Sequence, residues 1–582
     1  MSIINPKEQM AGMLVPVFAL RRQDDLGIGD TTAMKDALDF CARNSLAVLQ
    51  VLPINETGGD NSPYNALSSL ALDPVLLDVS PSAVPGLTAQ VYNELVTPET
   101  VNAIAGDAVN YATVKWLKLQ LLRAAYETFV ATETVGADAL ATEFRDFKAK
   151  HATWLQPYAL FRLLVDEYQG NACWPWWEPQ HQSLSTAEKW FDEKNDPRLQ
   201  KNRDFFAFVQ WVAFRQWDSV RAHADRLGIA LMGDLPFGIS RYSADVWAER
   251  DLFDLKWSGG APPEPYFQDS EFVVKWGQNW GIPLYKWDAH RKENFAWWRK
   301  RVGLLTQVFH YFRIDHVLGF FRIYAFPWIP ERNEEFVSLT EEEAKELTGG
   351  ELPHFIQRKD YPKELGELNA VDGEKLLVMI KEAAGEAGVV AEDLGVVPWY
   401  VRPMLRKLGI PGFAIPIFER DEETQEFKPK DELHALNLAT YATHDLAPLR
   451  AYYEDLVRRW HGQDGHAAWL DVQRLMRFLS LDPEHPPTSF TRELHIAFVT
   501  ALLETPCWLA MFMITDILGT SERYNEPGLA SNSNWSQRMH GSLVECERNP
   551  EWAEKIHLLS RLVKETGRLP RVPSLGTISS KK

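Results

Sequence analysis

Eight short apolar runs, separated by longer stretches, restrict the fold of this 582-residue chain more than any other feature. The runs are rich in Val, Ile and Leu, a pattern typical of parallel strands that are buried on both faces. They are Met13–Leu20, Leu46–Ile54, Ile229–Phe237, Val308–Phe312, Val389–Glu392, Phe413–Phe418, Asn437–Thr443 and Trp508–Leu518. With helical stretches between them, they predict an α/β protein, a closed (β/α)8 TIM barrel with inserted, largely helical subdomains.

The spacing of the runs is uneven, which predicts inserts within a single catalytic domain that spans residues 1–582. The interval of about 56–228 is far longer than one crossover helix needs, so we expect an inserted subdomain there. We expect smaller inserts and loops around the active site at about 238–307, 322–388 and 446–507.

Two stretches of these intervals carry local signals. Apolar residues recur at spacings of three and four in the first interval, which predicts a helix that packs on the core. They are Val114, Leu117, Leu121, Ala125 and Phe129. The Gly- and Pro-rich stretch Ser258–Pro265 predicts a loop over the mouth of the barrel.

Composition excludes several classes of function. The formal net charge of −19 argues against binding to a nucleic acid, which requires clustered Lys and Arg. We find no apolar run of about 18 residues and no targeting segment, so we expect a cytoplasmic protein with no membrane partner. The cysteines form no CxxC pair and indicate neither a zinc site nor a disulfide framework. They are Cys41, Cys173, Cys507 and Cys546.

Four carboxylates lie where apolar runs end. They are Asp234, Asp315, Glu392 and Asp445. In a barrel, the chemistry takes place at the carboxyl ends of the strands, and neighbouring strand ends bring residues together that are distant in sequence. These four side chains are therefore the first candidates for a site.

Asp315 and Glu392, at neighbouring strand ends, are candidates for the two carboxyl groups that cleave a glycosidic bond with retention. That reaction needs a nucleophilic carboxylate and a proton-donating carboxyl group about 5 to 5.5 Å apart. Asp315 follows Arg313 on the same face of a strand, and a guanidinium favours an ionised nucleophile. Glu392 follows three apolar residues, which favour retention of its proton and a role as general acid/base. Asp445 can bond two ring hydroxyls and stabilise the transition state.

Each of these residues also has a structural interpretation. A carboxylate at a strand end often caps the next helix or pairs with an arginine. Asp234, in Gly-Asp-Leu-Pro, favours such a role as part of a tight turn. His316 and His444 could be buried core histidines or could bond sugar hydroxyls. Three carboxylates at successive strand ends, two of them beside a histidine, favour a catalytic site.

Six motifs in a fixed order carry a resemblance to a known family. The motifs are Asp60–Tyr64, Gly233–Pro236, Ser243–Trp247, Tyr311–His316, Ala391–Gly395 and Thr443–Asp445. From about Leu14 to Arg538 the chain thereby resembles glycoside hydrolase family 77, the 4-α-glucanotransferases of the amylomaltase type.

The resemblance implies disproportionation of maltooligosaccharides or soluble α-glucans, with neither a cofactor nor a metal ion. It implies that Asp315 is the nucleophile, Glu392 the acid/base and Asp445 the transition-state stabiliser. The substrate-binding candidates are Arg313, His316, His444, Tyr64, Asp234, Trp280, Gln278 and Asn525.

The chain departs from the family pattern in two places. The usual Pro-Pro-Asp-Tyr-Phe loop reads Pro262–Phe267 with an added Pro and with Glu264 in place of Asp, and the usual Asn-Asp after the third carboxylate is Leu446-Ala447. The segments His316–Arg322 and Asn279–Pro283 resemble the plant cytosolic, maltose-using branch. No starch-binding module is evident, so we expect soluble oligosaccharides as substrates.

Two alternatives remain open at this point. One is an α-glucan hydrolase, in which water resolves the covalent intermediate on the same carboxylates. The other is a non-catalytic glucan-binding protein. The Trp-rich stretch Trp174–Trp177 could support binding, although it favours packing within the inserted subdomain.

Overall fold

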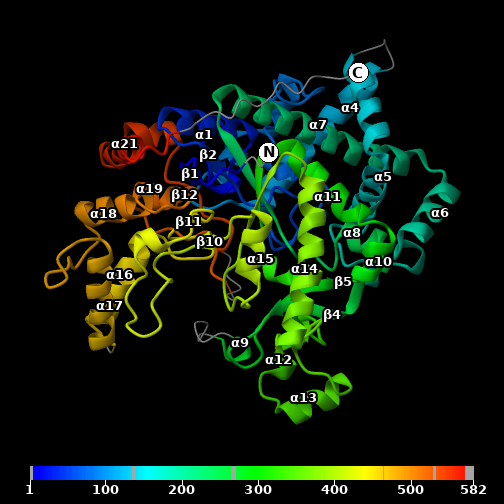
Figure 1. Cartoon of the computed structure of the whole chain (residues 1–582). Helices are drawn as coiled ribbons and strands as arrows, with labels where there is room; N and C mark the ends of the chain where they lie inside the picture. Colours follow the sequence, from blue (N-terminus) through cyan, green and yellow to red (C-terminus); the bar gives the residue numbers. More distant parts are fainter. Residues whose placement is uncertain (1–3, 134–138, 264–269, 463, 528–532, 570–582) are drawn as a thin grey trace.

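The computed structural model describes residues 4–133, 139–263, 270–462, 464–527 and 533–569 (Figure 1). Its central sheet has eight strands in the order β10-β11-β12-β1-β2-β3-β6-β9, and every neighbouring pair is parallel. The strands are β1 (Met10–Leu14), β2 (Val48–Gln50), β3 (Ala230–Leu235), β6 (Tyr311–Ile314), β9 (Gly388–Ala391), β10 (Phe413–Ala414), β11 (Leu438–Ala439) and β12 (Leu509–Met513). Each of the eight apolar runs overlaps one strand, which confirms the predicted (β/α)8 barrel.

The barrel closes at a seam between β9 and β10. No β-ladder joins these two strands within the described residues, but the backbone N–H of Ala391 donates to the carbonyl of Pro411 at 2.8 Å. The N–H of Phe413 donates to Oδ1 of Asp393 at 2.6 Å. A side chain therefore provides one of the bonds that close the barrel, in the residue next to Glu392.

Two of the apolar runs are only partly strand. The first begins with β1, but Val17–Ala19 forms a 3-10 helix, and in the last run β12 is followed directly by the helix α19 (Ile514–Leu518). The prediction extended both strands too far because continuous apolar sequence does not distinguish a buried strand from a buried helical turn.

The helices cover the barrel and build the inserts. Between β2 and β3 the chain forms α2–α7, of which α7 packs against α1 and β3 as a barrel helix does. The predicted apolar stripe from Val114 to Phe129 lies on α4, and its five residues are buried, which confirms the amphipathic helix. These helices are α1 (Thr31–Arg43), α2 (Ala89–Leu95), α3 (Pro98–Ile104), α4 (Tyr111–Glu133), α5 (Ala139–Glu167), α6 (Leu184–Lys194) and α7 (Pro197–Leu227).

The remaining helices belong to the later intervals. Those from residue 238 to 408 are α8 (Ala244–Ala248), α9 (Glu271–Trp276), α10 (Trp287–Lys292), α11 (Ala296–Val308), α12 (Asn333–Phe336), α13 (Glu341–Thr348), α14 (Lys363–Ala384) and α15 (Val401–Leu408). Those towards the end are α16 (Leu449–Trp460), α17 (Gly465–Phe478), α18 (Arg492–Leu503), α20 (Leu543–Arg548) and α21 (Pro550–Glu565). The division into one domain with inserts remains a prediction.

A second, antiparallel sheet joins two of the inserts. Its order is β5-β4-β7-β8, and its strands are β4 (Phe253–Ala261), β5 (Gln278–Tyr285), β7 (Ile323–Phe326) and β8 (His354–Ile356). The prediction of a loop from Ser258 was therefore wrong, because Ser258–Ala261 belongs to β4. Gly259 and Gly260 fit there because an added side-chain carbon would lie only 2.8 Å and 1.8 Å from atoms of β5.

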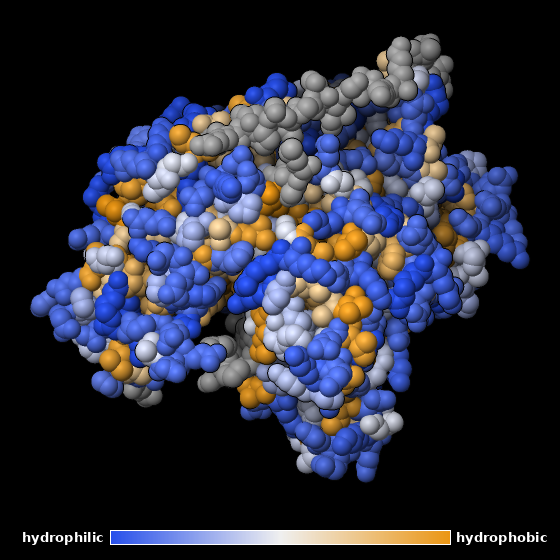
Figure 2. All heavy atoms as spheres, viewed as in Figure 1, coloured by the Kyte–Doolittle hydropathy of each residue, from blue (hydrophilic) through white to orange (hydrophobic). Residues whose placement is uncertain are grey.

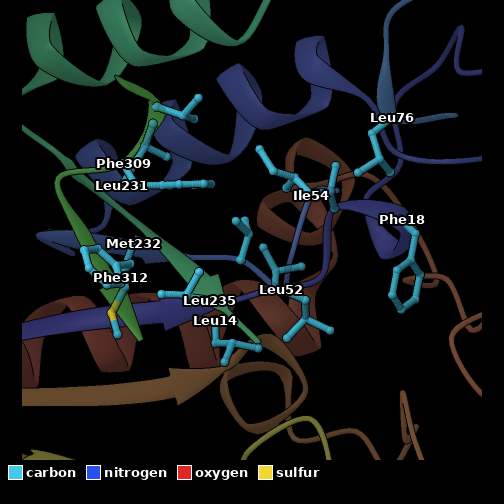
Figure 3. Packing of buried hydrophobic residues seen from close by; sticks show 14 of the residues in the cluster. Leu14, Phe18, Leu52, Ile54, Leu76, Leu231, Met232, Leu235, Phe309 and Phe312 are labelled. Carbon is cyan, nitrogen blue, oxygen red and sulfur yellow. The ribbon is translucent and has the colours of Figure 1, made fainter. Parts of the chain in front are cut away.

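Buried apolar side chains pack along the strands of the barrel. Figure 3 shows residues from β1, β3 and β6, among them Leu14, Leu231 and Phe312, gathered in one cluster, and all three are buried. On the surface, the projection that carries α12 and α13 and the one that carries α16 and α17 (Figure 1) are separated by a hollow (Figure 2). Trp177 packs inside the first insert as expected. Trp174 is also buried, but it contacts Arg241 and Arg250 of the next interval, and Trp176 is 83% exposed. None of the described helices is long and apolar enough to cross a membrane.

Candidate active site

The registers of β3, β6 and β9 bring the candidate residues together. Asp234 on β3 is the register partner of Arg313 on β6, and Ile314 on β6 is the partner of Ala391 on β9. Asp315 and Glu392 follow that last pair directly, at the carboxyl ends of adjacent strands. Strand pairing alone therefore places Asp315 and Glu392 next to each other. Asp234, expected in a tight turn, lies within β3 instead.

The guanidinium of Arg313 is the centre of the site. Nη1 lies 2.5 Å from Oδ2 of Asp234, and Nη2 lies 2.9 Å from Oδ1 of Asp315 and 3.7 Å from Oε2 of Glu392. Since both Asp315 and Glu392 approach the same nitrogen, their separation is compatible with the about 5 to 5.5 Å of retaining enzymes. Burial raises the pKa of Asp234 to about 6, and the charge of Arg313 opposes that rise.

Glu392 has the electrostatic surroundings of a proton donor. Burial raises its pKa to about 7, the nearby charge of Asp315 acts in the same direction, and Arg313 opposes the rise. The backbone N–H of His316 donates to its Oε2 at 2.6 Å. The other oxygen, Oε1, is therefore the one that can carry the proton towards a substrate. A carboxyl group with this pKa holds a proton in a substantial part of the molecules at neutral pH.

His316 turns the chain directly after Asp315. Its φ of 44° lies in the left-handed region, which is uncommon for a residue other than glycine and directs its N–H to Glu392. Burial lowers the pKa of its imidazole to about 4, so the ring is neutral at neutral pH. The ring meets the half-exposed Trp280 edge-on, with 4.8 Å between centroids, and Trp280 Nε1 donates to Oε1 of Gln278 at 3.1 Å.

Asp445 lies in a different environment from Glu392. Asn525 Nδ2 donates to its Oδ1 at 2.7 Å, and Nε2 of His444 lies 3.3 Å from its Oδ2. Burial alone would raise the pKa of Asp445, but the charge and hydrogen bond of His444 and the bond from Asn525 outweigh it and lower the pKa to about 2. Arg523 holds the backbone of the same residue through a 3.0 Å bond to its carbonyl.

Tyr64 links two parts of the site. Its hydroxyl donates to Oδ2 of Asp234 at 2.8 Å, and its ring stacks on His444 with centroids 5.0 Å apart. Trp535 packs against both rings at 5.8 Å. The structure therefore brings all eight predicted substrate-binding candidates close to the three carboxylates. Two of them already bond protein groups: Asp234 accepts from Arg313 and Tyr64, and Asn525 donates to Asp445.

Sequence reasoning did not assign two residues that contribute to this site. Arg523 lies in an irregular segment after α19, and no local pattern marks such a residue. Asp393, which closes the barrel seam, directly follows Glu392, so its position in the motif was a usable signal. The altered loop of Pro262–Phe267 lies outside the described residues from Glu264 onwards.

Comparisons with known proteins agree with this geometry. The model of a family described as 4-alpha-glucanotransferase matches residues 15–544. A 4-alpha-glucanotransferase of Chlamydia pneumoniae is 29% identical over 555 residues, which cover 92% of each chain. The rice enzyme 4-alpha-glucanotransferase DPE2 (Oryza sativa subsp. japonica) is 31% identical over 332 residues, 54% of this chain and 32% of its own.

Solved structures show the same fold. The amylomaltase of Streptococcus agalactiae, determined in complex with acarbose, superposes with a TM-score of 0.72 at 20% sequence identity and covers 96% of this chain and 100% of its own. Given the barrel, the three carboxylates at its strand ends and the family model that matches nearly the whole length, the chain belongs to the 4-alpha-glucanotransferase family, glycoside hydrolase family 77.

Proposed function

We propose that this 4-α-glucanotransferase moves glucan segments between maltooligosaccharides by retaining double displacement through a covalent intermediate on Asp315. The observation that carries the proposal is that one nitrogen of Arg313 lies beside both Asp315 and Glu392, while Glu392 has a pKa raised to about 7. One carboxylate is thereby held ready to attack and the other to donate a proton.

In the first half of the reaction, the donor glucan loses its reducing-end portion. Oδ1 of Asp315 is held by Arg313, which leaves Oδ2 to attack the anomeric carbon. The bond from that carbon to the glycosidic oxygen breaks, and the departing oxygen takes the proton from Oε1 of Glu392. Asp445, ionised at neutral pH, stabilises the positive charge that develops on the sugar ring.

In the second half, a sugar hydroxyl of the acceptor attacks the same carbon. Glu392, now a carboxylate, takes the hydroxyl proton, and the bond between the sugar and Asp315 breaks. Both carboxylates return to their initial state. Trp280 is half exposed beside His316, and we propose that its ring contacts the acceptor, with Gln278 holding the indole.

Besides Gln278, two more of the predicted substrate-binding residues orient other groups of the proposed site instead of contacting the sugar. Asp234 is buried and holds Arg313 and Tyr64, so it orients groups that meet the sugar. Asn525 holds Asp445 in the same way. We propose that direct sugar contacts come from Arg313, His316, His444, Tyr64 and Trp280.

We also propose that the enzyme works in the cytoplasm. All four cysteines are unpaired, and Cys41, Cys507 and Cys546 are buried. Free thiols of this kind are typical of a reducing compartment.

The test is incubation of the purified protein with maltotriose alone, followed by chromatography and glucose determination. Transfer predicts longer maltooligosaccharides together with glucose and no change in total reducing ends. The Asp315→Asn variant serves as the control and should form neither product. A rise in reducing ends without longer products would identify a hydrolase, and full activity of Asp315→Asn would refute the nucleophile assignment.

A further inference from the structure

Three apolar side chains are exposed at the catalytic end of the barrel without an assigned role. Tyr361 is 72% exposed, Val396 63% and Trp399 44%. Val396 and Trp399 lie in the connection that follows Glu392 at the carboxyl end of β9. Tyr361 precedes α14, the helix that leads into β9, so it lies at the same end, because a barrel helix runs antiparallel to its strand.

A buried network fixes these side chains relative to one another. The hydroxyl of Tyr400 donates to Oδ1 of Asp360 at 2.8 Å, which joins the neighbours of Trp399 and Tyr361. Arg322 also donates to Asp360 at 2.7 Å. Arg322 follows the turn that carries Asp315 and His316. The segment of the nucleophile and both exposed aromatic residues are therefore held by one ion-paired centre.

Trp399 is supported on its inner side. Its ring meets Tyr400 edge-on with centroids 5.3 Å apart, and the ammonium of Lys363 lies 5.4 Å from the ring centre. Gly366 of α14 comes so close that an added side-chain carbon would lie 3.4 Å from the indole. The contacts join α14 to the residues just before α15, and the two helices lie side by side (Figure 1). The indole is thus a supported surface open to solvent on its outer side.

We propose that Tyr361, Val396 and Trp399 form an outer glucan-binding subsite, here called the rim platform. The inference rests on the proposed transfer of glucan segments and extends it to longer chains. The C–H face of a glucose ring is apolar and packs on flat aromatic rings such as those of Trp399 and Tyr361. Trp399 lies seven positions after Glu392 in the chain, so the two Cα atoms are at most about 25 Å apart. A maltooligosaccharide that occupies the active site and extends outward can span such a distance.

The size of the rim platform favours a sugar over a second protein chain. Three side chains offer well under the roughly 800 Å² per partner that a stable protein interface buries. The large exposed apolar residues of α14 lie on a different face from Gly366, which packs under Trp399. They are Leu368, Val371 and Val378. They therefore do not extend the platform into a continuous patch.

Steady-state kinetics of the full-length enzyme with maltotriose and with maltoheptaose tests the inference. Trp399→Ala should lower kcat/KM for maltoheptaose by about three- to ten-fold and leave that for maltotriose within about two-fold. Trp399→Phe, which keeps a flat ring, should restore most of the loss. Tyr361→Ala should show the same preference with a smaller effect. Trp176→Ala, which removes a more exposed indole elsewhere on the surface, is the control and should change neither value.

Three results would overturn the rim platform. Equal losses of kcat/KM for both substrates would show that Trp399 contributes to stability or to the chemical step. No loss for either substrate would show that Trp399 does not bind the glucan. If light scattering shows that Trp399→Ala dissociates a dimer, the surface belongs to an interface between two copies. In all three cases the wild-type enzyme still forms longer products from maltotriose, whereas absence of those products would refute the proposed function itself.

Discussion

Glu392 and Asp445 are both carboxylates at strand ends near Arg313, yet their surroundings shift their pKa values in opposite directions. Glu392 accepts one backbone N–H, and burial raises its pKa to about 7. Asp445 accepts a bond from Asn525, faces His444 and has a pKa of about 2. Its side chain is also more exposed, 39% against 14%. The hydrogen-bond donors around Asp445 therefore keep it ionised, whereas Glu392, with fewer donors, keeps a proton that it can donate.

The largest effect is expected from Glu392→Gln, which removes the proton donor. We expect kcat/KM with maltotriose to fall by about 10²- to 10⁴-fold. In the wild type, kcat/KM should decline as pH rises through about 7, because Glu392 loses the proton that it must donate. The variant should lack this alkaline decline, and the measurement is the pH profile of glucose release.

Glu386→Gln is the control for that experiment, since Glu386 is an exposed glutamate in the turn before β9. It should retain the wild-type profile. An alkaline decline near pH 7 that persists in Glu392→Gln would show that another group titrates there.

Asp445→Asn should have the second largest effect, because it removes the charge that stabilises the transition state. We expect a loss of about 10²- to 10³-fold in kcat. The alkaline decline should move slightly towards lower pH, because the charge of Asp445 is one of the causes that raise the pKa of Glu392. A decline that moves towards higher pH in this variant would contradict that influence of Asp445 on Glu392.

Asn525→Ala tests whether hydrogen bonding lowers the pKa of Asp445. Loss of a bond to the charged carboxylate should raise that pKa, so that Asp445 takes up its proton at a higher pH as the solution is acidified. We expect the pKa of Asp445 to rise by about one to two units, so that the loss of kcat is larger near pH 4 than at pH 7. The pH profile of kcat measures this, and a uniform loss at both values would assign Asn525 to sugar binding instead.

Asp393→Ala should have the smallest effect on activity. It changes the surroundings of Glu392, its neighbour in the chain, and leaves those of Asp445 unchanged. It removes the bond to Phe413 that closes the barrel and the 3.0 Å ion pair with Arg402. We expect a loss of about 1 to 3 kcal/mol in the free energy of unfolding. Activity below the melting temperature should fall by only a few-fold. Thermal and urea unfolding measure the first change.

Arg402→Gln provides the comparison for Asp393→Ala. It loses the same ion pair but keeps the bond to Phe413, and the Arg402 side chain is 44% exposed. We expect a loss of less than about 1 kcal/mol. If both variants lose equal stability, the ion pair rather than the seam bond holds this part of the barrel.

Much of the fold could be predicted because buried parallel strands leave continuous apolar runs in the sequence. All eight runs overlap a strand, and the five-residue stripe of α4 is buried as expected. The antiparallel sheet could not be predicted in the same way. Its strand β4 contains the Gly-rich segment from Ser258 to Ala261, which local patterns assign to a loop, and it becomes a strand only through pairing with β5 and β7.

The sequence by itself determined the barrel class, the family resemblance and the identity of the carboxylates, because these depend on composition and on motifs of a few adjacent residues. Only the tertiary structure decided how the carboxylates differ. Asp234 and Arg313 meet through strand register, and Asn525 reaches Asp445 from 80 residues further along the chain. A pKa depends on burial and on donors within a few ångströms, and folding alone brings these groups together.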